Sequence, residues 1–172
     1  MSTNPFLHPS SLEYELPPFA VINDSHYLEA FYAGMEEQQK EIADITAHRE
    51  ITFENTIEAL ERSGQTLTRV ANVFYNKSSS DTNDTIDAIE AEIAPKLAAH
   101  SDSIKLNPQL FERISRLMDS VDSLNAEDAW ILQRYYEDFV HAGAKLTPEK
   151  RERVKAINEE LSSLQTAFAK NL

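Results

Sequence analysis

Apolar residues recur every three or four positions from His26 to the end of the chain, and this spacing predicts an all-α protein. Asn23, Asp24 and Ser25 offer N-cap oxygens, so a first helix is expected to run from there to about His48. Further helices are expected from Thr52 to Gly64, from about Gln65 to Lys77, from near Asn83, from Asn107–Pro108, from Asn125 to Gly143, and from Thr147–Pro148 onward. The pattern therefore indicates a multi-helix bundle of about seven helices.

Three details of this bundle are less regular. Ser78 to Thr82 is interpreted as a linker, because it is short, polar and lies between two periodic segments. Pro95 falls inside a predicted helix and is expected to kink or split it, since its ring clashes with the carbonyl four residues earlier. The aromatic residues Trp130, Tyr135, Tyr136 and Phe139 are interpreted as core.

The first 22 residues differ from the rest because they contain four prolines with apolar residues between them. Proline favours extended, irregular backbone, so residues 1–22 are predicted to form an arm that packs across the helices. Its apolar residues include Phe6, Leu7, Leu12, Tyr14, Leu16, Phe19 and Ile22. A frayed terminus is the alternative. Residues 23–172 are predicted to form the helical domain.

The last predicted helix carries a heptad-like apolar seam formed by Val154, Ile157, Leu161, Leu164 and Phe168. Such a seam needs a partner helix. The sequence stops at Leu172 without a capping residue, so we expect this helix to be truncated, with its seam partly exposed and able to drive self-association.

The composition excludes several functional classes. The chain has 172 residues with 16 Lys+Arg and 29 Asp+Glu, a formal charge of −13, which disfavours binding to nucleic acid and to an anionic membrane surface. It has no cysteine, which excludes disulfides and thiolate chemistry. Apolar runs are too short to span a membrane, and no Lys or Arg precedes Lys40, so a cytoplasmic location is expected.

The residues show no complete catalytic apparatus. No His-Glu-x-x-His motif occurs, although Asp138 and His141 are i, i+3 neighbours that could share a cation. Two ligands do not complete a metal site. Two acidic clusters, Glu36–Glu37–Glu41–Asp44 and Asp84–Asp87–Glu90–Glu92, are interpreted as solvated helix faces, with a surface for cations or basic peptides as the alternative. We therefore predict no catalytic, cofactor-binding or metal-binding residue in this chain.

An ordered series of short motifs nevertheless resembles a known family. The series is Asn4-Pro5-Phe6-Leu7, Leu16-Pro17-Pro18-Phe19, His26-Tyr27, Ala30-Phe31, Gly34-Met35, Phe53-Glu54-Asn55-Thr56-Ile57, Ala59-Leu60-Glu61, Ser63-Gly64, Leu67-Thr68-Arg69-Val70, Thr82-Asn83, Leu106-Asn107, Leu110-Phe111, Phe139-Val140 and Ala142-Gly143-Ala144-Lys145-Leu146. Together these segments resemble the N-terminal region of the thimet-oligopeptidase-like zinc metallopeptidases, and among them the peptidyl-dipeptidase Dcp branch more than the oligopeptidase A branch.

The resemblance implies a much longer parent that uses zinc to remove dipeptides from the C-terminus of oligopeptides. In that parent the partner of this region would be the C-terminal catalytic part of the same polypeptide, which carries the zinc ligands. The present chain would be a non-catalytic domain that walls the substrate channel. The alternative is a free-standing helical module that binds partner helices through the Val154–Phe168 seam.

Overall fold

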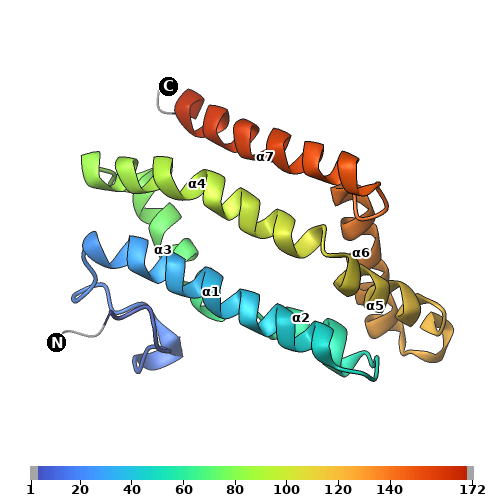
Figure 1. Ribbon diagram of the computed structural model, residues 1–172. Coiled ribbons are helices and arrows are strands. Elements are labelled where there is room, and N and C mark those ends of the chain that lie inside the picture. The colour runs from blue at the N-terminus through green and yellow to red at the C-terminus, as the bar shows by residue number, and fades with distance from the viewer. Residues whose placement is uncertain (1–3, 170–172) are drawn as a thin grey trace.

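The computed structural model describes residues 4–169, and this part of the chain is helical with no strand (Figure 1). The predicted all-α fold is confirmed. The α-helices are α1 (Ser25–Ala47), α2 (Ala59–Arg62), α3 (Gln65–Ser80), α4 (Asp84–Lys105), α5 (Pro108–Met118), α6 (Ala126–Ala142) and α7 (Pro148–Ala169). A π-helical turn, Glu54–Glu58, precedes α2, and short 3₁₀ turns lie at Glu13–Glu15 and Val121–Ser123.

The three longest helices, α1, α4 and α7, lie side by side in one layer (Figure 1). Helix α4 is central and contacts both α1 and α7. Helix α3 packs across α1, and α5 and α6 pack against each other at one end of the layer. Helix α7 therefore lies at the edge, with α4 as its main neighbour.

Two apolar cores hold this arrangement together. The first lies between α1, α3 and the start of α4 and contains Phe6, Tyr27, Ala30, Phe31, Val70, Val73, Phe74, Ile86, Ile89 and Ile93. The second lies between the end of α1, α2, α5 and α6 and contains Ile42, Ile45, Ile57, Leu60, Leu110, Ile114, Leu117, Leu132, Phe139 and Ala144. Most members of both cores belong to the apolar helix faces that the three- or four-residue spacing in the sequence predicts.

The predicted helix boundaries hold where a specific cap marks them. The side chains of Asn83, Asn107 and Asn125 each accept two backbone N–H groups at the starts of α4, α5 and α6. Gly64 and Gly143 adopt left-handed conformations, with φ of 71° and 109°, at the expected helix ends. The expected end of the last helix at Leu172 lies outside the described residues.

Three expectations were wrong. Residues 78–80 are not a linker, because α3 continues to Ser80 and the Ser79 and Ser80 hydroxyls donate to the Asn76 carbonyl. Of the kink or split expected at Pro95, the split is wrong, because α4 runs unbroken from Asp84 to Lys105. Because Pro95 has no N–H group, the carbonyl of Ala91 lacks its helical partner. Ala91 is exposed, so water can bind that oxygen. Trp130 is not core but 65% exposed.

The segment before α1 contacts the helices at its two ends. Phe6 is buried against Tyr27, with ring centroids 5.3 Å apart, and its carbonyl accepts from Arg69 at 2.6 Å. Ile22 packs against the first core. Between these points the apolar side chains of Leu12, Tyr14, Leu16 and Phe19 are exposed. The division into an arm of residues 1–22 and a helical domain of residues 23–172 stays a prediction.

Candidate functional site

The Asp138–His141 pair lies on the exposed surface of α6. One Asp138 carboxylate oxygen is 3.7 Å from the Arg134 guanidinium, a positive group that would repel a cation bound there. Within residues 4–169 no group of three or more His, Asp or Glu side chains is placed to hold a metal ion. These two residues therefore do not form a metal centre with other described side chains.

Members of the two acidic clusters serve as hydrogen-bond acceptors within the fold. Glu41 accepts from the Gly64 backbone N–H at 2.8 Å, which ties α1 to the turn before α3. Glu90 accepts from the Ser78 hydroxyl at 2.8 Å, and so joins α4 to α3. Glu36 forms an i, i+4 ion pair with Lys40 at 2.7 Å. These contacts give the acidic residues a structural role.

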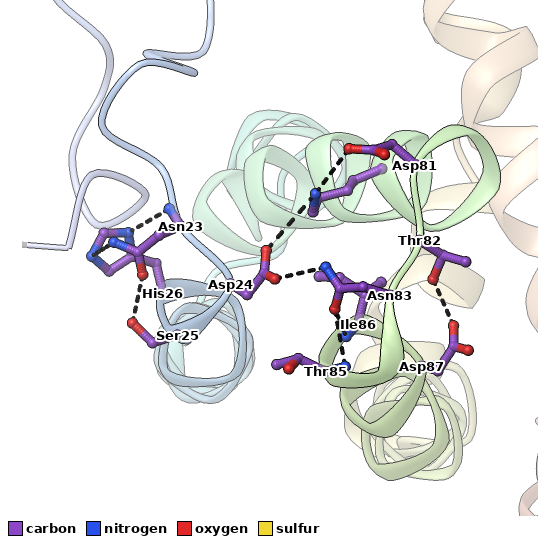
Figure 2. Close-up of polar contacts among 11 residues, drawn as sticks. Asn23, Asp24, Ser25, His26, Asp81, Thr82, Asn83, Thr85, Ile86 and Asp87 are labelled. Atoms are coloured by element: carbon purple, nitrogen blue, oxygen red, sulfur yellow. Dashed lines mark hydrogen bonds and ion pairs between the residues drawn. The ribbon is translucent and has the colours of Figure 1, made fainter.

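The start of α1 and the junction between α3 and α4 meet in a polar network (Figure 2). Asn83 caps α4 with its side-chain oxygen and donates its amide to the Asp24 carboxylate at 2.9 Å. Lys77 lies 3.9 Å from Asp24 and 3.3 Å from Asp81. This network fixes the ends of three helices.

A hollow of about 310 Å³ lies between α2 and α6. Its lining is Phe53, Ile57, Glu58, Glu61, Arg62, Gln65, Asp128 and Ile131. Glu58 pairs with Arg62, Asp128 accepts from the Asn125 amide at 2.8 Å, and Glu61 accepts from the Tyr135 hydroxyl at 2.7 Å. Burial and the Glu61 carboxylate together raise the pKa of Tyr135. The carboxylates of this hollow are thus engaged by side chains of the chain itself.

A buried histidine joins α1 to α4. His100 is 9% exposed, its Nε2 lies 2.7 Å from the Gln38 side-chain oxygen, and its Nδ1 lies 3.2 Å from the Gln39 side-chain nitrogen. Burial lowers the pKa of His100. The neutral tautomer with hydrogen on Nε2 satisfies both contacts, because it donates to Gln38 and accepts from Gln39.

Helix α7 turns a mostly polar face toward α4. The half-buried residues of α7 are Arg151, Val154, Lys155, Asn158, Ser162 and Thr166, which recur at helical spacing. Asn158 donates to the buried Asp102 carboxylate at 2.9 and 3.0 Å, and Arg151 donates to the Leu106 carbonyl at 3.3 Å. Polar contacts therefore contribute much of the attachment of α7 to the protein.

The apolar residues of α7 lie on another face, which is open. Ile157, Leu161, Leu164 and Phe168 are 44%, 47%, 60% and 66% exposed. They are three or four residues apart and so form one stripe. The expected partial exposure of the seam is confirmed, and we refer to these four residues as the α7 stripe.

Sequence reasoning found the α7 stripe but missed the buried polar residues. Asp102, His100 and Arg113 are each less than a tenth exposed. Neither their type nor their spacing distinguishes them in the sequence from polar residues on a wet face, because their partners come from other helices.

No family model matches the sequence. The whole chain is 37% identical to part of dipeptidyl carboxypeptidase from Salmonella typhimurium, and 98% of it is 36% identical to part of the Escherichia coli protein of the same name. Oligopeptidase A of E. coli is 24% identical over 99% of the chain.

The chain spans about a quarter of the length of these relatives, 26% of the Salmonella protein and 25% of each E. coli protein. None of the helices in residues 4–169 is long and apolar enough to cross a membrane. The identity with the two dipeptidyl carboxypeptidases extends along the chain, as the ordered motifs do. The resemblance to the peptidyl-dipeptidase Dcp branch of the thimet-oligopeptidase-like peptidases is therefore confirmed.

Proposed function

We propose that this chain is a non-catalytic helical region of a dipeptidyl-carboxypeptidase-like zinc peptidase, where it forms one wall of the channel that admits oligopeptides. The observation that carries the proposal is the 36–37% identity, over essentially the whole chain, with two proteins named dipeptidyl carboxypeptidase. The substrates would be oligopeptides, and the partner would be the C-terminal catalytic part of the same polypeptide.

The described residues do not fit a catalytic zinc site. Such a site takes three protein ligands and keeps a fourth position for water. Asp138 and His141 supply two at most, and Asp138 lies beside Arg134. No catalytic step is therefore assigned to this chain, and the zinc would lie in the part of the relatives that it does not span.

The arrangement of the helices supports the role as a wall. The layer formed by α1, α4 and α7 is long and continuous, and α4 joins the other two (Figure 1). Packing of the two cores holds α1 and α4 in place. A layer of this kind can limit access to a channel without contributing chemistry. A cytoplasmic location is part of the proposal.

The test compares the 172-residue chain with the full product of its gene. The gene product should release dipeptides from the free C-terminus of short peptides and lose this activity to a zinc chelator, whereas the isolated chain should do neither. A gene product about as long as the relatives that releases no dipeptide would contradict the proposal.

The exposed α7 stripe also favours a second function, a free-standing module that binds partner helices. The mass of the protein in its source cells distinguishes the peptidase region from the free-standing module. An antibody against the chain should detect a band several-fold heavier than 19.5 kDa in source cells if the peptidase proposal holds. A band at 19.5 kDa would favour the interaction module.

A further inference from the structure

We propose that the α7 stripe is the docking surface for an amphipathic helix of the same polypeptide, one that lies outside these 172 residues and places carboxylates opposite Lys150 and Arg153. The inference rests on the proposed function, because it requires a longer polypeptide. It goes beyond that function by naming the surface and the chemistry of the helix that covers it.

The stripe has the geometry of a helix-docking surface. Ile157, Leu161 and Leu164 follow at spacings of four and three, and Phe168 continues the row after four more residues. This is the repeat that lets two helices interlock their side chains along a shared seam. The face toward α4 is already used by Asn158 and its neighbours, so the stripe is not needed to attach α7.

A second copy of the chain, which the expected self-association would place on the stripe, is a poor occupant. A stable complex of two separate proteins buries roughly 800 Å² on each partner, whereas four side chains of about half exposure offer on the order of 400 Å². Each copy also carries a formal charge of −13, so two copies repel each other.

A tethered helix meets neither difficulty. Linkage within one polypeptide raises the effective concentration of the helix, so that a small apolar surface is enough for docking. The curated relatives are about four times as long as the chain, since it spans 25–26% of the two dipeptidyl carboxypeptidases. Most of a relative's length is thus available to provide the helix.

The charged residues beside the stripe indicate which charge the docking helix should carry. Lys150 and Arg153 precede Ile157 by seven and four residues, so they lie on the same side of α7. Both are exposed, and neither has an ion-pair partner within residues 4–169. The docking helix is therefore expected to combine an apolar stripe with Asp or Glu residues at the end that meets the start of α7.

The absence of cysteine from the sequence allows a direct accessibility test. Leu161→Cys places a thiol in the stripe, and Ser163→Cys places a control thiol on an exposed position two residues away, on a different face of the same helix. Each variant is made in the full gene product and in the 172-residue chain. Maleimide labelling is followed by mass spectrometry of the peptide that contains the introduced cysteine, so other cysteines do not interfere.

In the full gene product we expect Cys at 161 to react at least tenfold more slowly than Cys at 163, whereas the two should react at similar rates in the chain. The paired substitutions Lys150→Glu and Arg153→Glu should partly restore labelling at 161. Equal rates at 161 and 163 in the full product would overturn the proposal. So would a gene product of only 172 residues.

Dipeptide release, measured on the same preparations, separates this inference from the proposed function. A full product that releases dipeptides but leaves position 161 open refutes the docking surface alone. A full product that protects position 161 but releases no dipeptide supports the docking surface and contradicts the peptidase role.

Discussion

Asn158 of α7 donates its side-chain amide to both carboxylate oxygens of Asp102 on α4, at 2.9 and 3.0 Å. Asp102 is 7% exposed, so its carboxylate has left water and depends on partners within the protein. A buried charge without a partner costs far more than a neutral group does. The contact therefore fixes α7 on α4 at one defined position along the helix.

We expect Asn158→Ala to loosen α7 by roughly 1–3 kcal/mol, the usual penalty for a buried acceptor that loses its donor. The measurement is amide hydrogen exchange in α7, which should become faster than in the unmodified chain. Glu159→Ala changes the neighbouring exposed residue and should leave exchange unaltered. Equal protection of α7 in both variants would show that the Asp102 contact does not hold the helix.

Arg113 provides a second test of buried polar contacts. It is 4% exposed and donates to the His48 and Glu50 carbonyls, to the Asn55 side-chain oxygen and to the Thr56 hydroxyl. Together these bonds secure the segment between α1 and the π-helical turn. Arg113→Ala leaves all four acceptors without this donor.

We expect Arg113→Ala to reduce the free energy of unfolding by about 3 kcal/mol or more, as measured by urea denaturation. Arg116→Ala is the matched control, since Arg116 is exposed and pairs with Glu112 one turn earlier. Its loss should cost about 0–1 kcal/mol. A similar cost for the two substitutions would contradict the role of Arg113.

Gly34 marks a close approach of α1 to α3. A Cβ added there would lie 2.8 Å from the Leu67 backbone nitrogen and 2.9 Å from its Cα, which is too close for unmoved backbones. Substitution of a mid-helix glycine by alanine in open space gains about 0.5–1 kcal/mol. At this position the steric conflict should reverse that sign.

Gly34→Ala is therefore expected to lower the thermal midpoint of unfolding, and calorimetry of the purified chain would measure the change. The exposed Ser79→Ala in α3 serves as a control for a change in helix composition without a close contact. An unchanged or higher midpoint for Gly34→Ala would show that α1 and α3 separate without cost.

The sequence predicted elements well where a local signal decides the structure. Asn107 followed by Pro108 fixed the start of α5, and Gly143 fixed the end of α6, because caps depend on residues next to each other in the chain. The α7 stripe was also predicted, since its spacing is a local property. Its exposure was expected too, because an apolar seam without its partner helix faces solvent.

Features decided by tertiary contacts could not be predicted. Trp130 resembles a core residue by type, yet its side chain lies mostly in solvent, since the rest of the fold leaves it 65% exposed. Pro95 should break an isolated helix, but α4 is packed between α1 and α7. The inward polar residues Asp102 and Arg113 were missed for the same reason, because their partners lie 56 to 65 residues away in the sequence.

His100 should make the stability of the fold depend on pH. Burial lowers its pKa below the ordinary value of 6.5, so the unfolded chain binds a proton at this residue more readily than the folded chain does. Stability rises with pH wherever the unfolded state binds more protons. The contribution of His100 is thus fully present above pH 6.5 and is lost as the pH falls from 6.5 toward the lowered pKa of the folded state.

The variant His100→Gln removes this titration and keeps a polar side chain beside Gln38 and Gln39. It should be less stable than the unmodified chain at pH 7.5, because it loses the two-sided imidazole contact. The difference in free energy of unfolding between the two proteins should narrow as the pH falls to 5. At low pH the unmodified chain loses stability, because its unfolded state binds a proton at His100 more readily than its folded state does, whereas the variant has no such proton to bind. Urea denaturation at several pH values measures this difference. A difference that stays constant or widens at low pH would mean that His100 is protonated in the folded protein, and that its Nδ1 does not accept from Gln39.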